Sequence, residues 1–266
     1  MPVMDRVGIL GFGVMGEAFA VALRRAHPQL SLAVFDAKAE RREAARAVPG
    51  VTVAGSAAEL VRLGGLVILC VKPQDLEALA AGLKPVASSG RFVSILAGKR
   101  IQTIGGLLGA KMVARFMPNI AAVAGRALVG VSFADGAPEP FRTECLEAAA
   151  AFGKALEIPE RLMAAMTGLS GSGIAYVLSF VDSMALGGVA AGFDYPTALT
   201  VATEALESAA ALLKASGENP RALVAKVASP AGTTIQGLRA LERGGFTAAV
   251  MEAVEAAARR ATEFEG

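Results

Sequence analysis

The stretch RVGILGFGVMGEAFAVALRRA, residues 6–26, decides the fold of this 266-residue chain. It begins as a short apolar strand, passes through Gly11, Gly13 and Gly16, and continues as a helical pattern. In such a unit the first glycine makes a tight turn, the second lets a pyrophosphate approach the backbone, and the third lets the helix pack closely on the strand. The amides at the helix start would face the phosphates. We therefore expect dinucleotide binding here rather than a purely structural strand–helix unit.

The segment SLAVFD follows as a second strand and ends in Asp36, about 20 residues beyond the third glycine. An acid at this place can accept hydrogen bonds from the adenosine ribose hydroxyls. Because its carboxylate would repel the 2′-phosphate of NADP, Asp36 favours NAD. Lys38, Arg41 and Arg42 follow closely and could reverse that preference, or they could form the solvated face of the next helix. The sequence leaves the choice between NAD and NADP open.

Further strand-like runs recur with helical patterns between them, at residues 51–55, 66–71, 91–98 and 111–118. Continuous apolar strands of this kind, separated by helices, indicate a parallel sheet that is covered on both faces. Two more runs, at residues 127–133 and 154–159, extend the same sheet. The sequence predicts an α/β Rossmann-type doubly wound sheet, in which ligands lie beyond the carboxyl ends of the strands.

The strand signals stop at Glu160, and helical patterns follow to the end of the chain. They cover residues 171–192, 196–217, 219–229, 234–245 and 246–264. The first two patterns are apolar almost all round, which a single surface helix does not tolerate. Other helices should bury them, including helices of a second subunit. We expect a dinucleotide-binding domain over residues 1–157 and an all-α dimerisation and substrate domain over residues 158–266.

The segment VASPAGTTIQGL, residues 227–238, gathers hydroxyls and glycines at the start of one of these helices. Thr233 and Gln236 fit a capping box with Thr233 as N-cap. The early amides of such a helix form a natural anion site. Ser229 and Thr234 add hydroxyls, so a substrate carboxylate would fit. The alternative is a capped helix that holds nothing, which this segment taken alone favours.

Composition argues against several classes of protein. A net charge of +2 without any Lys/Arg-rich run does not fit nucleic-acid binding. The longest apolar runs, such as residues 63–71, are too short to cross a bilayer, and the N-terminus has no signal-peptide plan. Cys70 and Cys145 lack metal-ligand spacing and fit free thiols of a reducing cytoplasm. The single histidine, His27, is expected in an exposed loop. We expect a cytoplasmic protein without a metal, nucleic-acid or membrane partner.

Together these segments resemble the pyrroline-5-carboxylate reductase family along essentially the whole chain. The resemblance rests on GILGFGVMGEA near the start, VKPQD at residues 71–75 and RFMPN at residues 115–119. It is strongest in TGLSGSGIAY, GGVAAGF and NP…VASPAGTTI…LE, which lie in the helical half. The resemblance implies a Rossmann domain and a helical domain that interlocks between two subunits, with dimers that often assemble into decamers. It also implies reduction of L-1-pyrroline-5-carboxylate to L-proline by NADH or NADPH, the last step of proline biosynthesis.

The resemblance assigns roles to individual residues by motif. Those that would hold the cofactor phosphates are Gly11, Phe12, Gly13, Val14 and Met15. Those that would line the rest of the cofactor's path are Lys72, Pro73 and Ala97, with Asn119 near the nicotinamide. Those that would form the substrate loop are Val227, Ser229, Gly232, Thr233 and Thr234. In that loop the amides and hydroxyls would bind the carboxylate. Thr234 would act as the catalytic residue, with its hydroxyl on the ring nitrogen and a proton relayed through water.

Five places depart from the family's pattern. Ile174 replaces the proline of GSGPAY, Ile120-Ala121 replaces Thr-Pro, Asn219 replaces a common His, Val224-Ala225 replaces Lys-Asp, and Ala231 replaces the first glycine of PGG. The last change limits backbone freedom beside the carboxylate site.

Three alternative functions therefore stay open. One is a reductase of another cyclic imine, such as the six-membered homologue. A second is an enzyme like the β-hydroxyacid dehydrogenases, which need a catalytic lysine in the helical half, where Lys214 and Lys226 are the candidates. The third is a dinucleotide-binding scaffold without catalytic activity, against which the intact Gly-Thr-Thr loop argues.

Overall fold

The computed structural model describes residues 4–265, which fall into two compact units. One unit holds the chain up to Gly171 together with the C-terminal segment from Ala256, and the other is Ser172–Glu255. The chain therefore passes between the units twice. These units are defined by compactness, so the predicted domain boundary at residues 157/158 stays a prediction.

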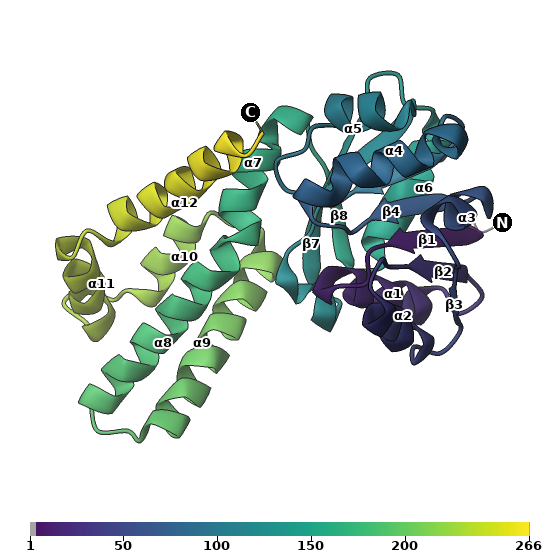
Figure 1. The fold of residues 1–266 in the computed structure, drawn as a ribbon. Coiled ribbons are helices and arrows are strands. Elements are labelled where there is room, and N and C mark those ends of the chain that lie inside the picture. The colour runs from purple at the N-terminus through teal and green to yellow at the C-terminus, as the bar shows by residue number, and fades with distance from the viewer. Residues whose placement is uncertain (1–3, 266) are drawn as a thin grey trace. The chain divides into compact units, whose positions relative to one another are not determined.

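One sheet organises the first unit (Figure 1). Its strands are β1 (Arg6–Leu10), β2 (Ser31–Phe35), β3 (Val51–Val53), β4 (Leu66–Leu69), β5 (Arg91–Ser94), β6 (Met112–Met117), β7 (Ala127–Phe133) and β8 (Gly153–Glu157). They are ordered β3-β2-β1-β4-β5-β6-β7-β8. All neighbours are parallel except β6 and β7, whose short connection permits only an antiparallel pair. The predicted doubly wound α/β sheet is confirmed, with this one antiparallel pair added.

Helices cover both faces of the sheet (Figure 1). They are α1 (Val14–Ala26), α2 (Ala39–Arg46), α3 (Ala57–Arg62), α4 (Leu76–Ala87), α5 (Ile101–Leu108) and α6 (Glu139–Ala150). Because successive strand side chains point to opposite faces, the strands feed two separate cores. Ile9 belongs to one core together with Phe19 of α1 and Phe141 of α6, while Leu10 belongs to the other core together with Leu76 of α4. The sheet is thus buried on both sides, which explains its continuous apolar strands.

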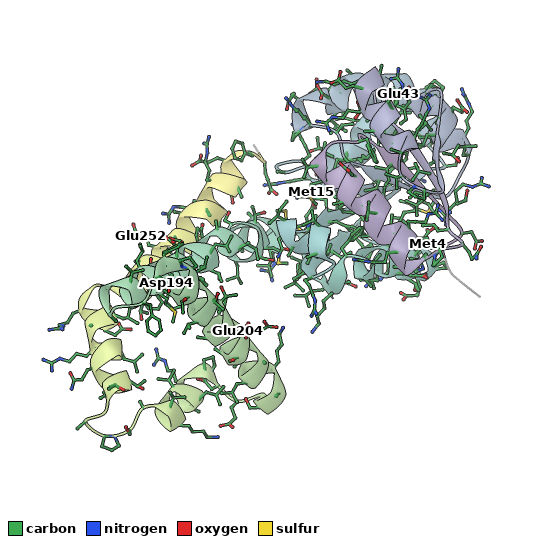
Figure 2. The ribbon with its side chains drawn as sticks, turned by 90° about the horizontal axis from the view of Figure 1, so that it is seen from below. Met4, Met15, Glu43, Asp194, Glu204 and Glu252 are labelled. Atoms are coloured by element: carbon green, nitrogen blue, oxygen red, sulfur yellow. The ribbon has the colours of Figure 1, made fainter. Side chains whose placement is uncertain are left out.

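Two short helical turns lie inside the first unit: η1 (Pro73–Asp75) between β4 and α4, and η2 (Ile120–Ala124) between β6 and β7. Three more lead from β8 to the second unit: η3 (Glu160–Leu162), α7 (Met163–Met166) and η4 (Thr167–Gly171). The second unit consists of α8 (Gly173–Ala190), α9 (Tyr195–Ser216), α10 (Pro220–Val227), α11 (Thr233–Arg243) and α12 (Phe246–Glu263), the last of which returns to the first unit. Asp194 lies at the beginning of α9 and caps it by accepting a hydrogen bond from the Thr197 amide (Figure 2).

The second unit buries little of its apolar surface. Its buried core consists of Val181 and Ala185 of α8 with Ala198 and Ala202 of α9. By contrast, Leu178 is 63% exposed and Met251 is 59% exposed, and many other large apolar side chains of this unit are also exposed. Exposed apolar surface of this extent marks a face that another chain covers.

Two expectations from the sequence need correction. The first is that every apolar run is too short to cross a membrane. The helical run Glu160–Ala190 is long and apolar enough to do so by length and composition alone, and 17% of its most apolar stretch is buried among the described residues. A search for uninterrupted apolar residues missed this run, because glycine, serine and threonine residues interrupt it without making the helix polar as a whole. His27 is not an exposed loop residue. It ends α1, and its half-buried ring places Nδ1 3.7 Å from Glu147 Oε1.

Candidate functional site

The three motif glycines meet three different surroundings. Gly11 has φ +99°, and a Cβ there would lie 2.7 Å from the backbone carbonyl carbon of Cys70. A Cβ on Gly16 would lie 2.1 Å from the Gly11 carbonyl oxygen. Nothing lies within 4 Å of a Cβ built on Gly13. The first and third glycines are therefore required by the packing of β1, β4 and α1, while the second faces open space that a pyrophosphate can approach.

Asp36 braces this glycine loop. Its Oδ2 accepts a hydrogen bond from the Phe12 amide at 2.7 Å, and its Oδ1 accepts one from the Lys38 amide at 2.8 Å. The Gly11 amide donates to the Phe35 carbonyl at 2.8 Å. Phe12 itself is fully buried beneath the loop. Each carboxylate oxygen keeps a further lone pair, but the first task of Asp36 is to join the ends of β1 and β2, which the sequence analysis did not anticipate.

A cavity of about 700 Å³ opens beside the loop. It is lined at the carboxyl ends of β1, β2 and β4 by Gly11, Gly13, Asp36, Lys38, Arg41, Cys70, Lys72 and Gln74, among others. Four of the predicted cofactor residues thus share one cavity at the sheet edge where ligands of such folds bind. Val14 is exposed, and Met15 lies beside it on the first turn of α1 (Figure 2). Pro73 follows Lys72 and begins η1.

The cations after Asp36 have separate roles. Arg42 donates from Nη1 to the carbonyl oxygens of Asp36 at 2.7 Å and Ala37 at 2.9 Å, and its guanidinium lies 5.8 Å from the centre of the Phe35 ring. It is thereby fixed to the main chain. Lys38 and Arg41 line the cavity, and their side chains have no hydrogen-bond or ion-pair partner among residues 4–265. Two free cations therefore stand beside the braced carboxylate.

Both cysteines are free thiols. Cys145 is buried in the core between α6 and the sheet, and Cys70 is half-buried at the end of β4, where it lines the cavity. Desolvation by burial raises the pKa of each thiol well above its ordinary value. Neither sulfur is therefore ionised at neutral pH, and Cys70 presents an uncharged wall to the cavity.

Ala97 and Asn119 follow the next two strands. Ala97 is exposed in the turn after β5. Asn119 is buried after β6, where its Oδ1 caps η2 by accepting a hydrogen bond from the Ala121 amide at 3.2 Å and its Nδ2 donates to Ser170 Oγ at 3.1 Å. Neither residue lines the 700 Å³ cavity. Asn119 has a structural role in any case, and its place near a nicotinamide stays a prediction.

The predicted capping box at the start of α11 is wrong. The N-cap is Gly232, which has no side-chain cap, and Thr233 is the first helical residue. The reason is a tight turn in which the Gly232 amide donates to the Ser229 carbonyl at 3.1 Å. A Cβ on Gly232 would meet Ser229 Oγ, so any other residue there would require the Ser229 side chain to turn away. Thr233 is thereby moved one place into the helix, and Gln236 no longer stands at N3.

This turn contains a strained residue. Ala231 has φ +57° and is the one non-glycine residue with positive φ among residues 4–265. An alanine in the left-handed region costs about 1–2 kcal/mol relative to the right-handed one. The departure from glycine at this position therefore leaves the backbone conformation in place but stores strain in it.

The beginning of α11 is open to a ligand. The hydroxyls of Ser229, Thr233 and Thr234 have no partner among the described residues, and no side chain caps the first amides. Thr234 is half-buried, and Val227, at the end of α10, is 62% exposed. Free amides at a helix start attract an anion. The five predicted substrate-loop residues thus lie around one set of unpaired donors between the end of α10 and the first turn of α11.

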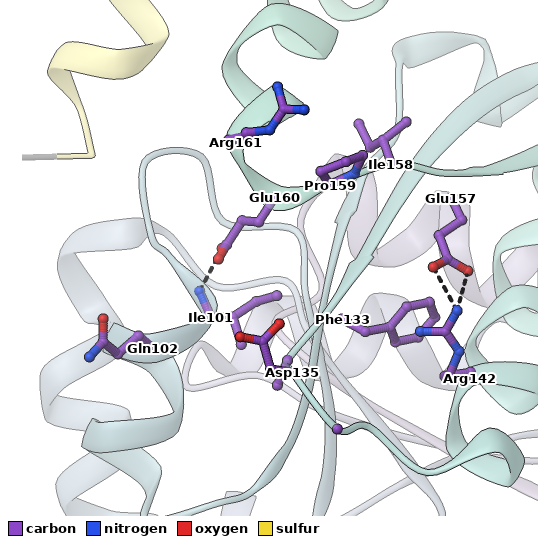
Figure 3. A pocket seen from close by; sticks show the side chains of 12 residues that line it. Ile101, Gln102, Phe133, Asp135, Arg142, Glu157, Ile158, Pro159, Glu160 and Arg161 are labelled. Atoms are coloured by element: carbon purple, nitrogen blue, oxygen red, sulfur yellow. Dashed lines mark hydrogen bonds and ion pairs between the residues drawn. The ribbon is translucent and has the colours of Figure 1, made fainter.

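Another cavity, of about 1000 Å³, lies between α5, α6 and the end of β7 (Figure 3). Arg142 crosses it to Glu157 with two hydrogen bonds of 2.7 and 2.8 Å. None of the predicted site residues lines it. Within residues 4–265 no group of three or more His, Cys, Asp or Glu side chains could hold a metal ion.

Comparisons with known proteins cover the whole chain. A family model described as pyrroline-5-carboxylate reductase dimerisation matches residues 160–264, and one described as NADP oxidoreductase, coenzyme F420-dependent, matches residues 6–98. The chain is 37% identical to the pyrroline-5-carboxylate reductase of Aquifex aeolicus over 257 residues, 96% of each protein. It is also 37% identical to that of Methanosarcina acetivorans over 264 residues, 97% of each.

A solved structure agrees with these sequence relatives. The pyrroline carboxylate reductase of Plasmodium falciparum with NADP bound superposes with a TM-score of 0.88 at 25% identity, covering 99% of this chain and 100% of that one. The match to the dimerisation model also explains the apolar surface of the second unit, because it lies on the same residues. This chain therefore belongs to the pyrroline-5-carboxylate reductase family.

Proposed function

We propose that this protein reduces L-1-pyrroline-5-carboxylate to L-proline with a reduced nicotinamide dinucleotide, the last step of proline biosynthesis. One observation of the structure carries the proposal: the start of α11 presents uncapped amides and unpaired hydroxyls within the family's substrate-loop motif. Such a helix start suits a carboxylate, which is the charged group of this substrate. The full-length relatives supply the class of reaction.

The glycine loop fits a dinucleotide. The open space at Gly13 and the cavity beside it would admit a pyrophosphate, which the amides of Gly13, Val14 and Met15 would bind, while the Phe12 amide stays bound to Asp36. Lys72 would add a positive charge to the same wall. When bound, the reduced nicotinamide supplies the hydride. The task of the protein is to hold the cofactor rigidly, and Asp36 serves it through its hydrogen bonds to the loop.

For the adenosine end we favour NADPH over NADH. Asp36 directs one lone pair of each oxygen to a backbone amide, so it serves the loop before it serves a ribose. Lys38 and Arg41 line the same cavity as unpaired cations and would bind a 2′-phosphate. The preference for NAD that Asp36 suggested is therefore outweighed by its surroundings.

The substrate half of the proposal needs few side chains. The amides of Thr233 and Thr234, with the hydroxyls of Ser229 and Thr233, would bind the carboxylate. The Thr234 hydroxyl would then donate to or accept from the ring nitrogen and relay a proton through water. A protonated imine accepts hydride readily, so positioning supplies most of the catalysis. The histidine of the chain has no part in this chemistry, because His27 ends α1 at the opposite end of that helix from the glycine loop.

The rival dehydrogenase chemistry finds little support. Lys226 donates two hydrogen bonds to the carboxylate of Glu218, at 2.6 and 2.7 Å, so this candidate is paired as a surface ion pair. Lys214 lies in the last turn of α9, where a cation complements the helix dipole. Lys226 directly precedes Val227 of the substrate loop, but its ammonium group is held by Glu218.

One assay tests the proposed function. The absorbance of NADPH and of NADH is followed separately while pyrroline-5-carboxylate, or its six-membered homologue, is supplied. We expect oxidation of NADPH with the five-membered substrate at the higher kcat/KM. Cofactor binding without oxidation by either imine would instead support the scaffold alternative, and faster reaction of the larger ring would assign the other imine.

The match to the dimerisation model supports a homodimer, and we propose that dimers assemble further into a decamer. Light scattering on the purified protein would give the mass directly. A decamer would have about ten times the 27.0 kDa mass of one chain, and a dimer about two times that single-chain mass. We also propose the cytoplasm as the compartment, because Cys70 and Cys145 are free thiols.

A further inference from the structure

Arg115 of β6 is a buried cation, only 5% exposed, to which the cofactor and substrate motifs assign no task. Its Nη1 lies 3.1 Å from Glu160 Oε1 and 3.0 Å from Glu265 Oε1. Glu160 begins the segment that leads out of the first unit, and Glu265 follows α12, where the chain has returned to it. One guanidinium thus holds both chain connections at the same strand, inside the first unit.

Both carboxylates also hold the loop between β5 and α5, residues 95–100. Glu160 Oε1 accepts a hydrogen bond of 2.7 Å from the amide of Ile101, the first residue of α5 (Figure 3). Glu265 Oε2 lies 3.4 Å from Nε of Arg100, the residue just before that helix. The exit of the loop is therefore fixed at two consecutive residues by acids from distant parts of the chain.

The middle of the same loop touches the C-terminal tail. Gly98 has φ +72°, and a Cβ there would lie 2.4 Å from the carbonyl oxygen of Phe264. The Phe264 ring is held in turn by Arg260, whose guanidinium lies 4.5 Å from its centre. Gly98 is required both by its backbone conformation and by this contact. The turn that carries Ala97 is thus packed against the last residues of the chain.

We propose that Arg115, Glu160 and Glu265 form a clamp that positions the loop at residues 95–100 for cofactor binding, so that the C-terminal tail is a working part of the cofactor site. The proposal rests on the proposed function, since this loop follows β5 and carries Ala97, a predicted cofactor residue. The three clamp residues act through the loop and are positioning residues.

The charges of the clamp explain why the loss of one acid matters. Arg115 and Arg100 are balanced by Glu160 and Glu265, so the cluster is neutral as a whole. Without the charge of Glu265, Arg115 would keep only Glu160 as a partner, and the cluster would carry one positive charge in excess. Strand β6 is paired on both sides, with β5 and with β7, and keeps its place without the clamp. The loop has no such ladder, so it takes up the disturbance.

The test uses Glu265→Gln in the full-length protein, with Glu252→Gln as the control. Glu252 is an exposed acid of α12 in the second unit, outside the clamp and the loop. Hydrogen exchange of the peptide that spans residues 95–101 is measured without cofactor. The dissociation constant for NADPH is measured by nicotinamide fluorescence. In Glu265→Gln we expect loop exchange to be about threefold or more faster and NADPH binding about fivefold weaker.

The control variant should match the unchanged protein in both measurements. With saturating NADPH, the KM for the imine should stay the same in both variants, which separates loop positioning from general damage. A second variant that ends at Glu263 removes Phe264 as well and should exceed Glu265→Gln in both effects. Unchanged loop exchange in Glu265→Gln, or faster exchange with unaltered NADPH affinity, overturns the proposal. If the unchanged protein binds neither NADPH nor NADH, the proposed function fails, while loop exchange still reports on the clamp.

Discussion

Two turns of this molecule, the glycine loop before α1 and the substrate loop before α11, offer backbone amides to an anion. Both contain a residue with positive φ, Gly11 at +99° and Ala231 at +57°. The glycine loop is anchored by the fully buried side chain of Phe12 and by the hydrogen bond from the Phe12 amide to Asp36. The substrate loop has neither a brace nor a buried base, and its side chains are largely exposed. The glycine loop is thus held in place before any ligand binds. The substrate loop contains a strained residue, and contacts with a ligand or a partner subunit can offset the cost of that strain.

The largest effect is expected from Gly16→Ala in the rigid turn. The added Cβ would meet the Gly11 carbonyl oxygen, and two packed backbones cannot both give way. We expect a loss of about 2–3 kcal/mol in the free energy of unfolding. Displacing α1 from the loop should weaken NADPH binding by about 100-fold. Thermal melting and fluorescence titration measure the two quantities.

Gly13→Ala is its control, because open space surrounds that position. This variant should keep its stability within about 1 kcal/mol yet still lose cofactor affinity, since the methyl group takes the space of the pyrophosphate. Equal stability of Gly13→Ala and Gly16→Ala would contradict the different tasks assigned to the two glycines.

The next largest effect is expected in the open turn, from Thr234→Ala. Loss of the hydroxyl should lower kcat by about 100-fold, the usual contribution of a positioned proton donor or acceptor. The dissociation constant for NADPH should stay within about twofold of the original, since the residues proposed to bind the cofactor lie in the first unit. Gln236→Ala, on the exposed part of α11, is the control. Full activity of Thr234→Ala would remove that hydroxyl from the mechanism.

A smaller effect separates the two cofactors. Arg41→Gln removes one of the two unpaired cations at the cavity, and loss of a charged hydrogen bond to a phosphate should weaken NADPH binding about tenfold. NADH binding should change little. Arg46→Gln is the matched control at the other end of α2, where the arginine pairs with Glu43. A parallel loss of both cofactors in Arg41→Gln would mean that this side chain reads no 2′-phosphate.

The smallest effect is expected from Ala231→Gly, which relieves the strained turn. The gain from the left-handed conformation exceeds the entropy that glycine adds to the unfolded chain, so we expect a net stabilisation of about 0.5–1 kcal/mol. The melting temperature should rise by about 2–3 °C when protein concentration is held fixed. Ala228→Gly, at a residue with φ −90°, should lower it instead. A lower melting temperature for Ala231→Gly would show that the turn is not strained.

Local chemistry made much of the fold predictable. Strand and helix periods, Gly217 at the end of α9 and Pro220 at the start of α10 are signals that neighbours in the chain carry by themselves. The glycine spacing before α1 was readable for the same reason. The N-cap of α11 was not, because the turn at Ser229–Gly232 decides it through a contact that a capping pattern does not encode.

The strands and helices, the glycine loop and the family motif of the substrate loop could each be recognised from a short stretch of consecutive residues. The pairing of β7 antiparallel to β6, the hydrogen bond from Phe12 to Asp36, and the ion pairs of Arg115 with Glu160 and Glu265 became visible in the folded chain alone. Each of these joins residues that lie far apart in the chain. Their partners are chosen by burial and by the need of buried polar groups to find hydrogen bonds, which no local pattern records.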